Sequence, residues 1–280
     1  MKKIDYANKY LNDIHTIISC PFCSASVNIK NNSIICSNNH TFNISKKGTV
    51  ILYKTSKLKK SKIYNSNLFI NRRKFINCGF YDNLHSEISK IINQNNIETI
   101  LDMGSGEGTH DFKIINHLVN ENIKLIGIDL SKDAIDLSND FLNDTYIGIV
   151  GDLNQLPFKD NTIDLILNIL SPSNEKEMAR VLKKNGMIIK VTPKYEYLYE
   201  LRKALNIKDY ENELIIEHNI EEKYDVLMKK EIMNCYPLDK EKLQYLIKMT
   251  PLTNHVADIP NIKSITIALN IYVLRIKDES

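Results

Sequence analysis

The segment that constrains the fold most is 100–108, which reads Ile-Leu-Asp-Met-Gly-Ser-Gly-Glu-Gly. It starts as the end of a buried strand, carries three glycines in five positions, and is followed by an amphipathic run over Asp111–Val119. A strand, a glycine turn and a helix in this order are typical of the cofactor-binding element of a doubly wound sheet, because glycine lets the backbone approach a ligand where a Cβ would clash. The sequence therefore predicts a Rossmann-like α/β domain.

The charge of this turn favours one kind of cofactor. The spacing is Gly-x-Gly-x-Gly through Gly104 and Gly106, and it lacks the ending that sets a helix N-terminus under a pyrophosphate. Glu107 also stands where a phosphate would be repelled. An acid before the turn, Asp102, and another inside it suit a cationic nucleoside without phosphate, which describes S-adenosylmethionine. A glycine turn with no cofactor is the alternative.

The next two predicted strands also end in acids. Lys124–Ile128 is followed by Asp129, and Tyr146–Val150 is followed by Gly-Asp152-Leu153. Since the carboxyl ends of parallel strands meet at one edge of a sheet, we expect Asp129 to accept bonds from ribose hydroxyls. Asp152 can bind an adenine amino group, with Leu153 against the ring. The alternative for any single acid is a helix N-cap or a turn residue.

A fourth strand, Ile163–Leu170, runs into the loop Ser171–Asn174, which we expect to bind the target next to the sulfonium. Asn174 and Glu107 are weak catalytic candidates, because an amide cannot take a proton and the cofactor can occupy Glu107. Three aromatics follow the fifth strand, and they either stack on a flipped base or cover the core; they are Tyr195, Tyr197 and Tyr199.

Four metal-ligand residues lie near the N-terminus. Cys20-Pro-Phe-Cys23 is followed after twelve residues by Cys36-x3-His40, and each pair fits one tight turn. Four such groups complete a tetrahedron around zinc, so we predict a structural zinc ribbon with a hairpin over 25–35. A disulfide between Cys20 and Cys23 is the alternative, which a cytoplasmic chain disfavours.

The charges are unevenly distributed. Residues 1–80, the basic front, hold fourteen Lys or Arg and two acids, a net +12, whereas the remaining residues carry a net −9. This asymmetry predicts contact with a polyanion, and a solvated lysine-rich face is the alternative. The predicted helix 65–77 also carries basic residues, and the candidate RNA contacts are Lys59, Lys60, Arg72 and Arg73.

The chain is long enough for one large and one small domain. We expect a ribbon over 1–53, a basic linker with helices over 54–97 and the cofactor domain over 98–280, closed by two strands with an antiparallel edge. No run reaches the roughly 18–20 apolar residues of a membrane span, and we expect a cytoplasmic protein. Residues 1–19 show no strong periodicity, and we make no prediction for them. Cys78 and Cys235 are expected to be buried as small apolar residues.

Taken together, these motifs resemble the bacterial 23S rRNA (guanine-N1)-methyltransferases over residues 19–276. Generic methyltransferases share only the glycine and acid motifs, whereas the wider set is specific. It comprises Cys-Pro-x-Cys, Cys-x3-His-x-Phe, Arg72-Arg73-x-Phe75, Gly79-Phe-Tyr81, the glycine turn, Gly127-Ile-Asp129-Leu-Ser-Lys, Leu156-Pro-Phe158, Ala179-Arg-Val and Met249-Thr-Pro251.

The resemblance implies a seven-stranded class I methyltransferase domain that holds S-adenosylmethionine and a zinc ribbon that grips RNA. It implies methyl transfer to N1 of a guanine in a 23S rRNA hairpin near the peptide exit tunnel. Cofactor contacts carry over to Tyr81, Gly106, Glu107 and Tyr197. At position 197 relatives have histidine in place of tyrosine. A small-molecule methyltransferase and a non-catalytic RNA- or ribosome-binding protein are the alternatives. The resemblance does not specify which guanine is methylated or which residue is the general base. It also leaves open whether the protein is a homodimer and whether the methylation confers antibiotic resistance.

Overall fold

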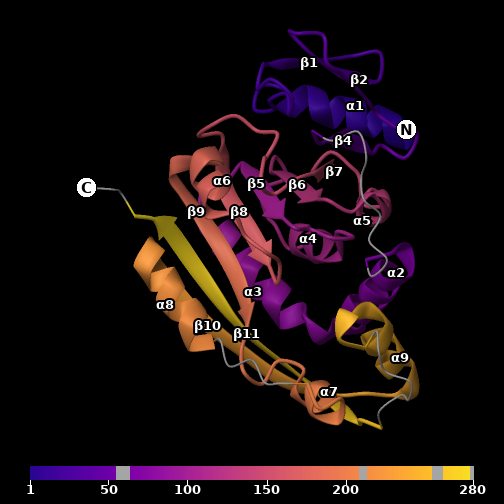
Figure 1. The fold of residues 1–280 in the computed structure, drawn as a ribbon, viewed down its shortest axis with the longest axis vertical. Helices are drawn as coiled ribbons and strands as arrows, with labels where there is room; N and C mark the ends of the chain where they lie inside the picture. Colours follow the sequence, from indigo (N-terminus) through magenta and orange to yellow (C-terminus); the bar gives the residue numbers. More distant parts are fainter. Residues whose placement is uncertain (55–63, 208–212, 254–260, 278–280) are drawn as a thin grey trace.

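An eight-stranded sheet forms the centre of the computed structural model, which describes residues 1–54, 64–207, 213–253 and 261–277 (Figure 1). The strand order is β10-β11-β9-β8-β5-β6-β7-β4, and a second sheet of order β1-β2-β3 lies near the N-terminus. The strands are β1 Val27–Lys30, β2 Ser33–Cys36, β3 Thr41–Asn43, β4 Val50–Leu52, β5 Thr99–Met103, β6 Lys124–Asp129, β7 Tyr146–Gly151, β8 Ile163–Ile169, β9 Leu182–Pro193, β10 Tyr224–Pro237 and β11 Ser264–Ile276.

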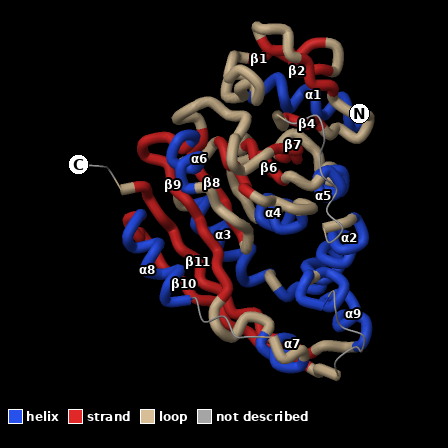
Figure 2. Tube along the Cα trace, viewed as in Figure 1, coloured by secondary structure: helices blue, strands red, loops and turns tan. Residues whose placement is uncertain are grey.

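Helices cover both faces of this sheet (Figure 2). Side chains of α1, α6 and α8 share one core with the sheet, and side chains of α3, α4, α7 and α9 share the other. Strands buried on both faces are nearly continuous apolar runs, as β7 is. The helices are α1 Lys3–Ile14, α2 Ser66–Phe75, α3 Asp82–Asn93, α4 Thr109–Ile115, α5 Lys132–Ser138, α6 Glu175–Val181, α7 Tyr199–Ala204, α8 Glu213–Lys223 and α9 Lys240–Met249.

Strands β5 to β11 confirm the predicted seven-stranded sheet with an antiparallel edge. Neighbours among β5 to β9 are parallel, whereas β11 pairs antiparallel with both β9 and β10. The eighth strand is β4, which comes from the predicted ribbon segment and pairs parallel with β7, Val50 opposite Ile149. One strand of the N-terminal segment is therefore part of the main sheet, whereas β1, β2 and β3 form their own.

The first helix, α1, lies in the segment for which the sequence predicted no element. Ala7, Tyr10, Leu11 and Ile14 are buried and recur at the spacing of one helix face. The Tyr10 hydroxyl donates to the carbonyl of Leu125, 2.9 Å away, at the start of β6. This contact ties the N-terminus to the sheet.

Other local predictions are confirmed or corrected. The hairpin is present, and Asn31 and Asn32 form its turn with φ of +50° and +56°. The predicted helix over Asp111–Val119 begins earlier and ends at Ile115. The expectation for Cys235 was wrong, because it lies exposed on the edge strand β10.

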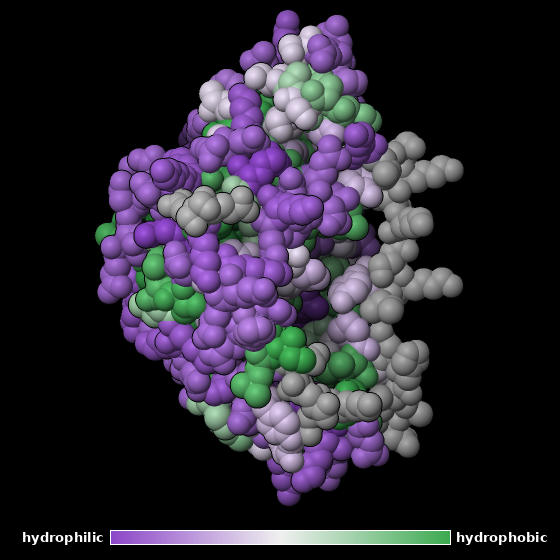
Figure 3. Space-filling model, turned by 60° about the vertical axis from the view of Figure 1, so that its left-hand side comes forward, coloured by the Kyte–Doolittle hydropathy of each residue, from purple (hydrophilic) through white to green (hydrophobic). Residues whose placement is uncertain are grey.

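No described helix has both the length and the apolar character that crossing a membrane requires. The face of the molecule in Figure 3 is mostly hydrophilic, with separate hydrophobic patches.

Candidate metal centre and cofactor site

The predicted metal ligands meet at one point of the ribbon. The ligand atoms of Cys20, Cys23, Cys36 and His40 all lie within 4.8 Å of one another. His40 Nδ1 is 3.4 Å from both Cys23 Sγ and Cys36 Sγ and 3.6 Å from Cys20 Sγ. A zinc tetrahedron with Zn–S of about 2.3 Å and Zn–N of about 2.0–2.1 Å has S–N edges of about 3.6 Å. The cluster therefore has the size that zinc requires.

The cysteines of this cluster are free thiols, so the disulfide alternative is wrong. Cys23 Sγ and Cys36 Sγ are 3.8 Å apart, which matches the S–S edge of a zinc tetrahedron, about 3.8 Å, and far exceeds a disulfide bond. The Phe22 ring stacks on the His40 ring with centroids 5.2 Å apart. This contact orients the imidazole toward the thiols.

The glycine turn, Gly104–Gly108, follows β5 and leads into α4. Gly104 has a φ of +87°, and a Cβ there would lie 2.6 Å from Ser171 Cβ and 3.9 Å from Leu153. At Gly106, with φ +58°, a Cβ would meet an Arg72 nitrogen at 3.6 Å. At Gly104 only glycine combines this backbone angle with so close an approach, whereas a Cβ at Gly106 would make an ordinary contact. The turn thus brings Leu153, Ser171 and Arg72 to one place.

The acids at the strand ends differ in their contacts. Asp129 accepts bonds from the backbone N–H groups of Gly106, at 3.0 Å, and Ser131, at 2.8 Å, so it fixes the turn. Burial raises the pKa of Asp129, and these two bonds oppose that rise. Asp152 accepts from the Asn154 backbone at 2.9 Å. Both acids keep the strand-end positions predicted from the sequence.

Asp102 is buried beside a second buried acid, Asp111. Burial raises the pKa of Asp102 to about 7. Burial, followed by the charge of Asp102, raises the pKa of Asp111 well above its usual value. Among the described residues, Oδ1 of Asp102 and both carboxylate oxygens of Asp111 have no hydrogen-bond partner. Two close buried carboxyls cannot both ionise cheaply, so this pair holds protons near neutral pH.

Glu107 is buried inside the turn and bound by Arg73. Arg73 Nε lies 3.3 Å from Glu107 Oε2, and the same guanidinium donates to the carbonyls of Glu107 and Leu137 and to Asp140. Thr109 also donates to the Glu107 carboxylate. Burial raises the pKa of Glu107, and Thr109 and Arg73 lower it in part. Arg73, predicted to contact RNA, is thus used within the protein.

Several other cations of the basic front also pair with acids of the body. Lys3 pairs with Asp140 at 2.6 Å, and Lys47 with Asp136 at 3.1 Å. Part of the charge asymmetry therefore docks the front onto the sheet domain. Lys59 and Lys60 lie outside the described residues.

Tyr81 and Tyr197 meet across the site, although 116 positions separate them. Their hydroxyl oxygens are 2.8 Å apart and both side chains are buried. The edge of the Tyr81 ring meets His110, the second residue after the glycine turn, with ring centroids 5.1 Å apart. Arg202, fully buried on α7, donates to the Tyr197 carbonyl at 3.0 Å and to that of Tyr195. The turn before α7 is thereby fixed against Tyr81.

The sequence analysis missed the residues that hold the target loop. Asn168, buried in the apolar run of β8, donates to Ser171 Oγ at 2.7 Å and to the Pro172 carbonyl at 3.0 Å. Lys190 on β9 donates to Asn168 Oδ1 at 2.8 Å. Asn174 caps α6 by accepting from the Glu177 backbone at 3.2 Å. A polar residue inside an apolar strand was the available signal.

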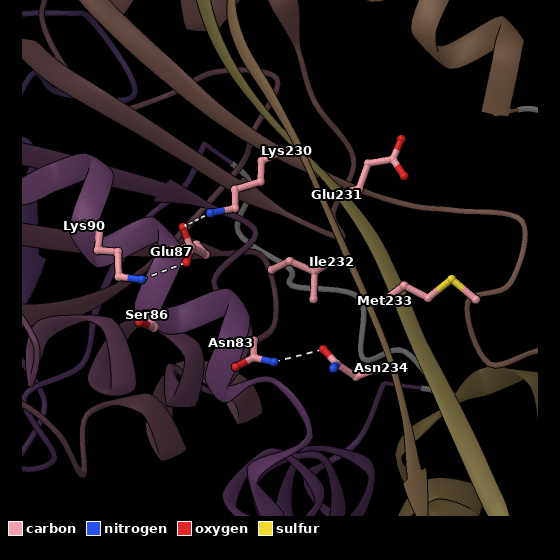
Figure 4. Close-up of a pocket in the computed structure, with 9 residues that line it drawn as sticks. All are labelled: Asn83, Ser86, Glu87, Lys90, Lys230, Glu231, Ile232, Met233 and Asn234. Atoms are coloured by element: carbon pink, nitrogen blue, oxygen red, sulfur yellow. Dashed lines mark hydrogen bonds and ion pairs between the residues drawn. The ribbon is translucent and has the colours of Figure 1, made fainter.

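A separate cavity of about 320 Å³ lies between α3 and β10 (Figure 4). Glu87 points between Lys90 and Lys230 and pairs with both, and Asn83 bonds to Asn234 at 2.9 Å. None of the predicted site residues lines this cavity. Because Lys90 and Lys230 already pair with Glu87, we assign the cavity no ligand.

The residues around the glycine turn fit S-adenosylmethionine. The glycines at 104 and 106 let the backbone of the turn lie close to Ser171 and Arg72, and unpartnered buried oxygens of Asp102 and Ser105 lie at the same strand end. Acids at the ends of β5 and β6 suit a cationic nucleoside. The arrangement can hold a methyl donor beside the loop Ser171–Asn174.

Two family models match the chain. A methyltransferase-domain model covers residues 94–249, and the model of the RlmA N-terminal zinc ribbon covers residues 18–62. The second match spans the cluster of Cys20 to His40, and the first spans the glycine turn. The two models therefore match the two sites that the structure shows.

The chain is also similar to curated rRNA methyltransferases. YxjB of Bacillus subtilis, provisionally named a 23S rRNA (guanine-N(1)-)-methyltransferase, is 33% identical over 92% of this chain and 96% of its own length. The 23S rRNA (guanine(748)-N(1))-methyltransferase of Streptomyces fradiae is 22% identical over the same shares. A chain from the complex between the Haloferax volcanii Trm112 methyltransferase activator and a methyltransferase shares the fold, with a TM-score of 0.50, 15% identity, and coverage of 78% of this chain and 100% of that chain. The chain therefore belongs to the family of 23S rRNA (guanine-N1)-methyltransferases, S-adenosylmethionine-dependent enzymes with a structural zinc ribbon.

Proposed function

We propose that this protein methylates N1 of one guanine in a 23S rRNA hairpin near the peptide exit tunnel, in the cytoplasm. The observation that carries the proposal is the combination of a zinc-sized Cys3His cluster with an acid-lined glycine turn in one chain. The relative from Streptomyces fradiae, named for guanine 748, supports a single guanine of 23S rRNA as the target. A small-molecule substrate would leave the zinc ribbon without a role.

We assign the adenosyl half of the cofactor to the acids at the strand ends. Asp129 serves the ribose hydroxyls while it holds Gly106, and Asp152 and Leu153 serve the adenine. Asp102, Gly104 and Glu107 shape the turn beneath. Bound S-adenosylmethionine supplies an electrophilic methyl group on a sulfonium.

The methionyl half belongs to the other side of the turn, where Tyr81 bonds to Tyr197. Arg202 holds the carbonyl of Tyr197, so the phenol keeps its position. Tyrosine in place of histidine at 197 keeps a hydrogen-bonding group there.

The target guanine loses its N1 proton during transfer, and the protein's main contribution is positioning. Of the two catalytic candidates, Asn174 cannot accept a proton, and Glu107 is bound by Arg73 and Thr109. Asn168 and Lys190 orient the loop that faces the base edge. We leave the general base unassigned.

We propose that RNA is gripped by the ribbon, residues 1–53, and by the basic linker that contains Lys59 and Lys60, ahead of the cofactor domain 98–280. Arg73 is assigned to the glycine turn instead, because four of its five donors are bonded within the protein. A homodimer is the alternative to a single-chain grip, and the mass of the purified protein in solution decides between them.

The test is methyl transfer onto unmodified 23S rRNA, with the site read by reverse transcription. N1 methylation blocks Watson–Crick pairing, so we expect a new stop at one hairpin guanine that depends on S-adenosylmethionine. Methyl transfer to small molecules but not to rRNA would contradict the proposal.

A further inference from the structure

The side chain of Arg72 lies over the glycine turn, whereas the predicted RNA contacts were expected on the outside of the helix. Its Nη1 atom is 3.6 Å from the position that a Cβ on Gly106 would take, next to a Phe69 ring carbon at 3.9 Å. The guanidinium carbon is 5.5 Å from the centroid of the Phe69 ring. The cation thus occupies the side of the turn that α2 covers.

Arg72 has no hydrogen-bond or ion-pair partner among the residues that the structure describes, and it is only partly exposed. The next residue, Arg73, also lies over a ring, Phe141, but it bonds to two carboxylates and two carbonyls as well. A guanidinium offers five donors, and leaving them unused in a partly buried place is costly. The contrast points to a ligand for Arg72 that is not part of this chain.

The charges around Arg72 limit the class of that ligand. Arg72 lies beside Gly106, which precedes Glu107 and donates its backbone N–H to Asp129, so its charge opposes the rise that burial causes in the pKa of both acids. Two buried acids so close to Arg72 would repel a polyanion such as RNA. They tolerate a small zwitterion that carries its own cations together with one carboxylate.

From this geometry we infer that Arg72 binds the α-carboxylate of the methionyl end of S-adenosylmethionine. The inference rests on the proposed cofactor site and adds a residue to it. The acids of the site, Asp102, Glu107 and Asp129, would repel a carboxylate, and Arg73 already uses four of its five donors within the protein. Guanidinium and carboxylate match as a bidentate pair, which gives the site a preference for the amino-acid tail over an amine alone.

Calorimetric titration of the full-length protein tests this with two probes, S-adenosylmethionine and its decarboxylated analogue. Both probes carry adenosine, the sulfonium and the amine, and only the first carries the carboxylate. In Arg72→Gln we expect affinity for S-adenosylmethionine to fall about 10- to 100-fold, as for the loss of a hydrogen bond to a charged group. Affinity for the analogue should stay within about twofold of the wild type.

Lys74→Gln is the matched control, since Lys74 lies exposed on the same helix and faces Tyr245. It should change neither affinity. Arg72→Gln should keep the wild-type urea midpoint, because Arg72 has no described polar partner to lose. An unfolded Arg72→Gln would be replaced by Arg72→Lys, for which a partial loss of the preference is expected.

Equal losses for both probes, a gain in affinity, or weaker binding of an rRNA hairpin alone would overturn the inference. The last result would make Arg72 a phosphate contact. If the wild type bound both probes equally well, Arg72 would have no such role while the proposed function would stand. If it bound neither, the proposed function itself would fail.

Discussion

Arg73 Nε and Glu107 Oε2 lie 3.3 Å apart, and this ion pair joins α2 to the interior of the glycine turn across 34 positions of sequence. Glu107 is only 2% exposed, whereas the Arg73 side chain is 20% exposed. A carboxylate so deeply buried depends on its cation. The pair therefore couples the order of the turn to the docking of α2.

We expect Arg73→Met to lower the free energy of unfolding by about 2–3 kcal/mol, because it leaves a buried carboxylate without its cation. The double variant Arg73→Met/Glu107→Gln should recover part of the loss. Urea unfolding measures both, with Lys74→Met as the control. A wild-type midpoint for Arg73→Met, together with weaker RNA binding, would return Arg73 to the RNA interface.

The pair Asp102–Asp111 should make stability depend on pH. Burial raises the pKa of Asp102 to about 7 in the folded protein, so the folded state holds a proton that the unfolded chain releases near pH 4. Stability is then lost as the pH rises from about 4 through 7. We expect Asp111→Asn to match the wild type only below about pH 4, and its advantage to grow by up to about 1.4 kcal/mol per pH unit between about pH 4 and pH 7.

Urea unfolding at several pH values checks this result. Asp225→Asn, at an exposed position on β10, is the control and should show no such trend. A constant difference between Asp111→Asn and the wild type across the range would contradict the raised pKa.

Zinc should be bound at one ion per chain and should stabilise the fold. We expect Cys36→Ser to lose most of the metal and to lower the melting temperature by roughly 5 °C or more. Elemental analysis and thermal unfolding measure the two effects. Cys78→Ser removes a thiol outside the cluster and should keep the zinc content of the wild type; equal zinc in Cys36→Ser would exclude the assigned ligand set.

Gly104→Ala should cost about 1–3 kcal/mol and weaken cofactor binding, because a Cβ would lie 2.6 Å from Ser171 Cβ at a φ of +87°. Adding Ser171→Gly removes the contact but not the backbone strain, so it should restore only part of the stability. Unfolding curves measure the stability of each variant, and calorimetry measures its affinity for S-adenosylmethionine. Full stability in Gly104→Ala would show that the loop moves away freely.

Local patterns explain what could be predicted from the sequence. The hairpin follows from Asn31-Asn32 between apolar strands, and the zinc cluster follows from two short spacings. The positions of Asp129 and Asp152 could be predicted because each acid follows an apolar strand. Neighbouring parallel strands end at the same edge of the sheet, so their acids lie there too.

Contacts between distant segments could not be predicted in this way. Nothing near Arg73 in the sequence indicates that its partner is Glu107 rather than a phosphate. Asn168 lies inside an apolar run and gains its role only from the loop packed against it. α1 did carry a helical spacing, but its remaining positions mix polar residues with Ile4 and Tyr6, which blurs the apolar face.

The pairing of β4 with β7 has a consequence for target choice. Since the strand that leaves the ribbon is hydrogen-bonded into the main sheet, the zinc-bearing head is held at a constant separation from the methyl donor. We expect the enzyme to methylate only a nucleotide that lies at one fixed distance from the RNA feature bound by the zinc ribbon.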